Sequence, residues 1–122
     1  MIRIISYLAR FRIVRAVMSW VISNMSFIIP SERLRETASW IAFYHPRPAY
    51  KFHILLIPKH EYKSLTEIPV EDTKVISELV VVVQSIIEEY KLNHTRYRII
   101  TNGGNYQDVP YLHFHLVADE LK

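Results

Sequence analysis

Residues 111–117 read Tyr-Leu-His-Phe-His-Leu-Val, so that two imidazoles alternate with apolar side chains. Side chains of an extended strand point alternately to its two faces, which places His113 and His115 on one face together with Tyr111. Phe114 and the two leucines point to the opposite face, where they can join a hydrophobic core. The stretch therefore predicts a strand with one face in the core and one face that carries polar chemistry.

The pattern of the surrounding residues predicts the other elements of a sheet. β-branched and aromatic residues favour strands, and prolines end them. Residues 70–90 instead repeat apolar side chains at helical spacing after an acidic start that suits the helix dipole. The expected strands cover residues 33–36, 39–44, 51–58, 95–101 and 111–117. The predicted fold class is therefore α+β, an antiparallel sheet of about five strands with one long helix.

The N-terminal segment requires its own explanation. Residues 1–30 carry four arginines and no acidic residue, and residues 3–25 place apolar side chains at the spacing of an amphipathic helix. The apolar stretch 16–29 is shorter than the roughly 20 residues that span a membrane. Three interpretations stay open: a helix packed on protein, a helix on a membrane surface, and an import peptide. We expect this helix to precede one domain, residues 31–122, in the cytoplasm or peripherally at a membrane.

The composition limits the chemistry of this domain. The chain has 122 residues, of which 50% are hydrophobic and 22% charged, as is usual for one packed domain. It contains no cysteine, which excludes disulfides, thiolate zinc sites and cysteine nucleophiles. Acidic and basic residues nearly balance after residue 30, so no nucleic-acid partner is expected. Any catalytic group must therefore be an oxygen or an imidazole.

The pair His113 and His115, taken alone, is compatible with three roles. It can bind a divalent metal, supply a nucleophile with a helper, or simply pack in the structure. A zinc ion would need further ligands, and the available ones are His53, His45 and Asp108. The pair by itself leaves these alternatives open.

A glycine turn precedes the histidine pair. Residues 101–110 read Thr-Asn-Gly-Gly-Asn-Tyr-Gln-Asp-Val-Pro and contain both glycines of the chain. A sequence with so few glycines is expected to place them where the backbone requires them. Backbone amides in such a turn, with the side-chain amides of Asn102 and Gln107, are suitable donors for phosphate oxygens. A phosphate cradle beside two imidazoles favours phosphoryl chemistry over metal storage.

Two separated motifs resemble those of the histidine triad (HIT) family. Asn102, then Gln107-Asp-Val, then residues 111–117 resemble the end of a HIT domain, with its signature His-φ-His-φ-His-φ-φ, in which φ is hydrophobic. Upstream, Ala42-Phe43 followed by His53-Ile-Leu-Leu-Ile-Pro-Lys resembles the other family motif. The two motifs occur in the family's order with a helix between them, and together they cover about residues 33–118.

The resemblance implies a role for each matching residue. His113 takes the middle triad position, whose imidazole attacks the α-phosphorus and becomes transiently nucleotidylated. His115 takes the last position, which contacts phosphate oxygens, and His53 matches a histidine that supports the triad through hydrogen bonds. The other matching positions are phosphate contacts at Asn102 and Gln107 and a base and ribose pocket lined by Phe43 and Tyr44.

The resemblance also implies an activity and partners. It predicts a nucleotide hydrolase or nucleotidyl transferase that cleaves a phosphoramidate or phosphoanhydride at the α-phosphorus through a covalent nucleotidyl-histidine. The expected substrate is a purine nucleotide or nucleotide conjugate, and the expected assembly is a homodimer. No cofactor and no metal are expected.

Three positions depart from the family pattern. Tyr111 occupies the first triad position, where a phenol can donate one hydrogen bond but cannot become an imidazolium. Asp108 replaces a phosphate-binding serine, and His45 replaces a ribose-binding aspartate. We retain Asp108 and His45 as nucleotide-binding positions and Tyr111 as a catalytic one. The departures also favour an alternative, a nucleotide-binding or regulatory protein with weakened catalysis.

Overall fold

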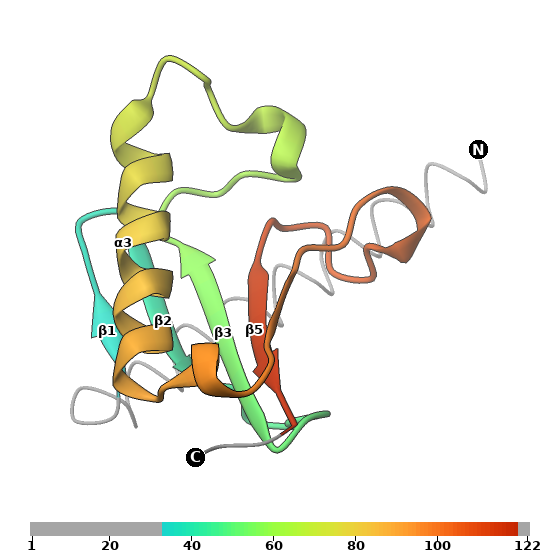
Figure 1. Ribbon diagram of the computed structural model, residues 1–122. Helices are drawn as coiled ribbons and strands as arrows, with labels where there is room; N and C mark the ends of the chain where they lie inside the picture. The colour runs from blue at the N-terminus through green and yellow to red at the C-terminus, as the bar shows by residue number, and fades with distance from the viewer. Residues whose placement is uncertain (1–32, 120–122) are drawn as a thin grey trace.

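The computed structural model describes residues 33–119, which form a five-stranded antiparallel sheet with one long helix across it. The strands lie in the order β1-β2-β3-β5-β4. Figure 1 shows α3 running along one face of the sheet. The elements are β1 (Arg35–Glu36), β2 (Trp40–Tyr44), β3 (Phe52–Pro58), α3 (Thr73–Glu89), β4 (Arg98–Ile100) and β5 (Phe114–Ala118). The predicted fold class is confirmed, whereas the expectations for residues 1–30 lie outside the described residues.

All five strands are shorter than the sequence predicts, and for β4 and β5 the preceding chain shows the reason. β5 begins at Phe114 and not at Tyr111, because the chain reaches it through a bend that includes Pro110. β4 begins at Arg98 because residues Leu92–His94 form a short 3-10 turn before it. His113 therefore lies just before the strand, where the backbone is outside the regular hydrogen-bond pattern of the sheet.

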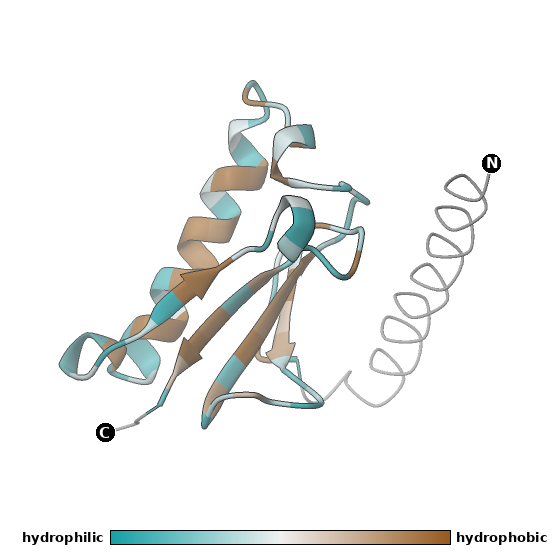
Figure 2. Cartoon of the chain, turned by 90° about the vertical axis from the view of Figure 1, so that its right-hand side faces the viewer, coloured by the Kyte–Doolittle hydropathy of each residue, from teal (hydrophilic) through white to brown (hydrophobic). Residues whose placement is uncertain are grey.

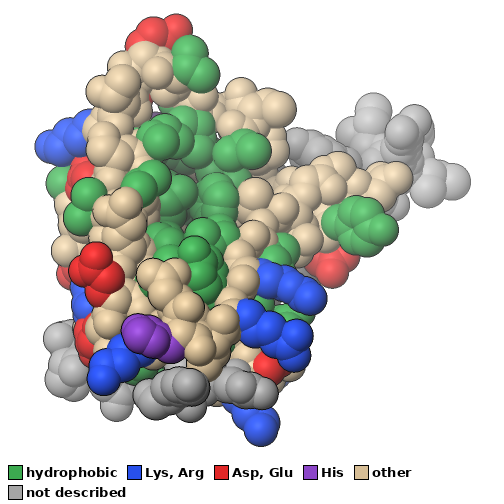
Figure 3. All heavy atoms as spheres, viewed as in Figure 1, with side chains coloured by type: hydrophobic (Ala, Val, Ile, Leu, Met, Phe, Trp, Pro, Cys, Tyr) green, Lys and Arg blue, Asp and Glu red, His purple; other side chains and the backbone are tan. Residues whose placement is uncertain are grey.

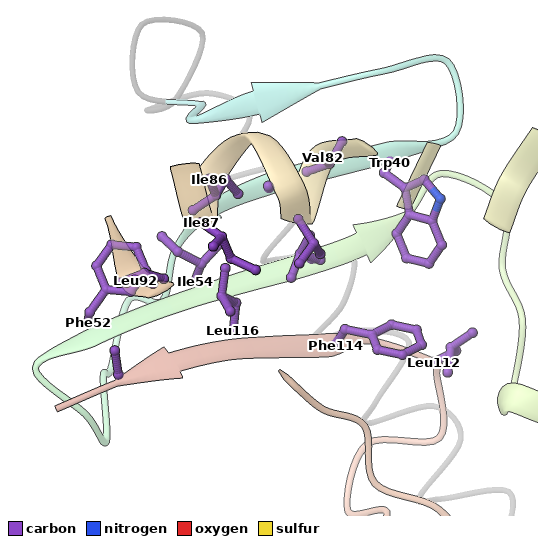
Figure 4. Close-up of a cluster of buried hydrophobic side chains, with 14 of the residues drawn as sticks. Trp40, Phe52, Ile54, Val82, Ile86, Ile87, Leu92, Leu112, Phe114 and Leu116 are labelled. Carbon is purple, nitrogen blue, oxygen red and sulfur yellow. The ribbon is translucent and has the colours of Figure 1, made fainter. Parts of the chain in front are cut away.

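The core lies between α3 and one face of the sheet. Alternate residues of the central strands, such as Leu56 and Leu116, point to this face and are fully buried. Figure 4 shows the Leu116 side chain beneath those of α3, with Trp40 and Phe114 at one end of the cluster. The Trp40 indole donates a hydrogen bond of 2.8 Å to the Val75 carbonyl, which satisfies its one polar group in the core.

Helix α3 is positioned by its N-terminal cap. Asp72 caps the helix, and its side chain accepts a hydrogen bond from the Val75 amide at 3.4 Å. The helix therefore begins at Thr73, slightly after the start that the sequence pattern predicts. Among residues 33–119, no helix combines the length and apolar character needed to cross a bilayer.

The opposite face of the sheet carries a smaller apolar cluster. Phe43, Leu55 and Ile57 are buried there, with Ile41 packed against them. Figure 2 shows largely hydrophobic strands and largely hydrophilic loops, and Figure 3 shows hydrophobic side chains gathered beside α3 with charged ones around them. Because the central strands are apolar on both faces, a polar side chain on either face stands out as a functional candidate.

Truncating the core beneath α3 should cost stability without touching the histidine face. Leu116→Ala is expected to lower the free energy of unfolding by about 2–5 kcal/mol, because Leu116 is 0% exposed and a cavity would remain. Val81→Ala serves as the control, since Val81 is 59% exposed and its truncation should change stability by less than about 0.5 kcal/mol. Urea denaturation followed by far-UV circular dichroism measures both, and equal effects would contradict the assigned core.

Candidate active site

Four imidazoles form a continuous group on the face of the sheet opposite α3. The β3–β5 register pairs Leu55 with His115 and His53 with Val117, so the two histidines are diagonal neighbours with ring centroids 5.0 Å apart. His113 lies 4.9 Å from His115, and His45 stacks on His53 at 4.4 Å. Local alternation selects the face, and strand pairing brings together residues that are far apart in sequence.

Hydrogen bonds fix the orientation of the rings of His53 and His115. The Ala49 amide donates to Nδ1 of His53 at 3.1 Å, so the proton of neutral His53 resides on Nε2. That Nε2 lies 2.8 Å from Nδ1 of His115 and therefore donates to it. Neutral His115 then carries its own proton on Nε2. The relay leaves a hydrogen-bond donor at the end of the His115 ring.

His113 has the opposite tautomer. Its Nδ1 lies 2.8 Å from the Tyr111 carbonyl oxygen, which can only accept a hydrogen bond, so Nδ1 carries the proton. The lone pair of neutral His113 is therefore on Nε2. The Thr101 hydroxyl donates to the His113 carbonyl at 2.8 Å and ties this bend to the end of β4. One imidazole thus offers a lone pair beside another that offers a proton.

Burial keeps the supporting imidazoles neutral. It lowers the pKa of His53 to about 4, with repulsion from a charge on His45 as the smaller cause. Burial also lowers the pKa of His115 to about 4, assisted by repulsion from His113, His53 and His45. The pKa of His45 is lowered by burial and then by repulsion from His113. Near neutral pH these three rings are therefore uncharged.

The predicted phosphate contacts lie on the connection between β4 and β5. Figure 1 shows this segment as an orange arm that projects beyond the end of β5. Asn102 and Asp108 are exposed on it, and the Gln107 side chain donates to the Lys63 carbonyl at 2.5 Å. The β4–β5 pairing ends at Ile100 and His115, and the Thr101 hydroxyl just beyond it donates to the His113 carbonyl. Asn102 thus directly follows a residue that contacts His113, whereas the Gln107 amide is engaged with the Lys63 carbonyl.

The backbone conformation requires a glycine at only one of the two glycine positions of this turn. Gly104 has φ of +57°, a left-handed conformation that side chains disfavour. Gly103 has an extended backbone with φ of −137°, and a side chain there would meet no atom within 4 Å. The backbone geometry therefore explains Gly104 and not Gly103.

The two residues predicted to line a base and ribose pocket lie on opposite faces of the sheet. Phe43 pairs with Leu55, which pairs with His115, so Phe43 is on the histidine face and is buried in its apolar cluster. Tyr44 lies on the other face, towards α3. Its hydroxyl hydrogen-bonds that of Tyr90 at 2.5 Å at the end of α3, because consecutive residues of β2 alternate between faces.

Tyr111 contacts the group through its backbone. Its side chain is buried beside a small cavity of about 70 Å³ that Pro58, Tyr62 and Leu112 also line. The contact with His113 is made by the Tyr111 carbonyl oxygen. A residue of any type supplies this carbonyl, so the contact does not depend on the side chain at position 111.

The sequence motifs did not predict three contacts that support the imidazole group. Thr101 holds the His113 carbonyl, the Ala49 amide fixes the His53 tautomer, and Tyr50 packs edge-on against His53 at 5.5 Å. Two of them come from the connector between β2 and β3, which the sequence presents only as a proline-rich linker. The Ala49 contact is made by a backbone amide and the Tyr50 contact by an aromatic ring, so neither requires a particular motif residue.

The comparisons with known proteins agree with this arrangement. The model of the HIT domain matches residues 26–121, and the chain therefore belongs to the HIT family. A histidine triad protein from Clostridium difficile has a similar structure, with a TM-score of 0.69 and 31% identity over 85% of this chain and 90% of that one.

Two sequence relatives are informative. An uncharacterised HIT-like protein from Buchnera aphidicola is 29% identical over 75% of this chain and 83% of its own length. The adenosine 5′-monophosphoramidase of Candida albicans is 33% identical over 73% of this chain, which spans 62% of that enzyme. A named enzyme is thus among the relatives of this chain, alongside a protein without a named activity.

Acidification should destabilise the fold through the supporting histidines. The folded pKa of His53, about 4, lies below its ordinary value of 6.5, so the unfolded chain binds protons first as the pH falls. The free energy of unfolding should therefore decrease progressively from about pH 6.5 towards pH 4. Urea titrations at a series of pH values measure this slope. His53→Gln removes the titrating ring, and an unchanged slope in that variant would contradict the assignment.

Proposed function

We propose that the chain hydrolyses or transfers nucleotides by cleaving a phosphoramidate or phosphoanhydride at the α-phosphorus through a covalent intermediate on His113. The observation that carries this proposal is the hydrogen bond from His113 Nδ1 to the Tyr111 carbonyl at 2.8 Å. It directs the lone pair to Nε2, and a neutral imidazole held in this way is a competent nucleophile near pH 7. The similarity to an adenosine monophosphoramidase supports the choice of substrate class.

The reaction divides into two displacements at phosphorus. In the first, Nε2 of His113 forms a bond to the α-phosphorus, and the bond to the leaving group breaks with its electron pair on the leaving atom, which takes up a proton. In the second, water attacks the same phosphorus and the P–N bond breaks, which restores His113 and releases the nucleoside monophosphate and a proton. Two such steps replace one more difficult hydrolysis.

His115 stabilises the charge that develops on the phosphoryl oxygens. Its Nε2–H points away from the His53 contact and donates to a non-bridging oxygen. His53 acts behind it as a positioning residue, since its hydrogen bond of 2.8 Å fixes the His115 tautomer. Tyr111 supports the nucleophile through its carbonyl, so catalysis in this proposal does not depend on an imidazole at position 111.

Trapping the intermediate tests the proposal directly. After incubation with a radiolabelled adenosine phosphoramidate and a quench in base, the nucleotidyl adduct should be found by mass spectrometry on His113. His113→Ala should lose the adduct and at least about 1000-fold of turnover while still binding AMP, because the nucleophile is gone. His94→Ala is the matched control, since His94 is exposed outside the imidazole group. Full activity in His113→Ala would overturn the proposal, and AMP binding without any turnover in the native protein would favour the regulatory alternative.

We also propose that the chain forms a homodimer through the edge of the sheet at β4. β4 is a terminal strand of the sheet in the described residues, and its Ile99 is 48% exposed. Tyr97 beside it is 38% exposed, and an edge strand presents unpaired backbone groups that a second copy can satisfy. α3 adds exposed apolar side chains at Ile76 and Val80.

A charge on this edge should disrupt the dimer. Ile99→Lys is expected to shift the mass measured by size-exclusion chromatography with light scattering from dimer to monomer, because a buried lysine would lose its hydration. Val70→Lys is the control, since Val70 is 83% exposed in the loop before α3. A native protein that is monomeric at micromolar concentration, or a dimer that tolerates Ile99→Lys, would contradict this interface.

A further inference from the structure

Three of the four imidazoles have the composition of a metal site. One ring nitrogen from each of His45, His53 and His115 lies within 4.8 Å of the others, and His53 is buried. Neutral imidazoles are common ligands of zinc. Whether this group binds a cation or an anion depends on which nitrogens carry lone pairs and which carry protons.

The lone pairs of all three rings are already engaged. A neutral imidazole has one lone pair and one N–H group. Nδ1 of His45 accepts a hydrogen bond from the Arg47 amide at 3.0 Å, and Nδ1 of His53 accepts one from the Ala49 amide at 3.1 Å. Nδ1 of His115 accepts from His53 at 2.8 Å. A metal ion would have to displace these hydrogen bonds and reverse the tautomers that the backbone amides impose.

Two N–H groups are left over. They are Nε2–H of His45 and Nε2–H of His115, and neither has a protein acceptor in the part of the chain that the structure describes. The two rings are stacked at 22° with centroids 5.9 Å apart. Two such donors can contact oxygens of one phosphorylated ligand, whereas an N–H group has no lone pair for a cation.

We propose that His45 is a substrate-binding residue whose Nε2–H binds a second oxyanion of the nucleotide, next to the phosphoryl group held by His113 and His115. The inference rests on the proposed function, because it takes the reacting phosphorus to lie at His113. The ligand class is a nucleotide that carries two phosphates. The second phosphate either follows the α-phosphate in a phosphoanhydride or is attached to the ribose.

The character of the donor explains why an anion suits this position. His45 is half-buried and stacked on His53, so its ring is held in one orientation. The Arg47 amide fixes its proton on Nε2, and the ring therefore presents a donor and cannot accept a hydrogen bond from a ligand hydroxyl. A carboxylate in its place would have the opposite preference, since it only accepts hydrogen bonds and would repel a phosphate.

Substitutions at His45 separate these effects. His45→Gln retains an N–H donor at a similar reach, His45→Ala removes it, and His45→Asp replaces it with an acceptor. Calorimetric binding in EDTA is measured with AMP, with adenosine 5′-(α,β-methylene)diphosphate and with adenosine 3′,5′-bisphosphate. These ligands need no turnover, and the last two distinguish a phosphate in the anhydride from one on the ribose.

The native protein should bind one of the two doubly phosphorylated ligands about tenfold more tightly than AMP, as expected for one hydrogen bond to a charged group. His45→Gln should keep most of this gain, His45→Ala should lose it, and His45→Asp should prefer AMP. Equal binding of all three ligands, or a gain that survives His45→Ala, would overturn the inference alone. Failure to bind AMP at all would overturn the proposed function with it. Stoichiometric binding of Zn²⁺ that is lost in His45→Ala would also refute the inference. Zinc binding requires nitrogen lone pairs on these rings that are not engaged in hydrogen bonds.

Discussion

The antiparallel pairing of β3 with β5 is the constraint on which the rest of the structure depends. Its register places Leu56 and Leu116 towards α3 and brings His53 and His115 together on the other face. A shift of the register by one residue would move the histidines under the helix and the leucines to the opposite surface. The hydrophobic effect that fixes α3 on the sheet therefore also fixes the position of the imidazoles.

The imidazoles of the site have two properties that matter for its chemistry. Three of them are uncharged near neutral pH, and hydrogen bonds decide which ring nitrogen donates and which accepts. Burial lowers the pKa values of His53 and His115 to about 4, so the rings act through N–H groups and lone pairs and not through charge. Backbone groups then decide the direction, because the Ala49 amide can only donate and the Tyr111 carbonyl can only accept. The result is a lone pair at His113 beside a donor at His115, and the proposed attack on the α-phosphorus uses both.

Two residues join the imidazole group in ways that the sequence pattern does not specify. Tyr111 contributes its backbone carbonyl to His113, and this contact is independent of the side chain at that position. His45 stacks on His53 and accepts a hydrogen bond from the Arg47 amide, so its ring leaves an N–H group available. In our proposal, this N–H group is what distinguishes the ligand preference of this member of the HIT family.

The sequence by itself determined the fold class, the strand that carries His115, and the family, because strand alternation and motif spacing are local properties of the chain. It did not determine that Tyr44 lies on the α3 face, since the prediction followed the motif and not the alternation of β2. The tautomers of His45, His53 and His113 are set by backbone groups within four residues, whose bends the motifs do not specify. Only the tertiary structure decided the His115 tautomer and the inclusion of His45, because these depend on rings that meet through the pairing of β3 with β5 and of β2 with β3. The alternation of residues along a strand predicts which face of the sheet a side chain takes. The pairing between distant strands determines which residues it contacts on that face.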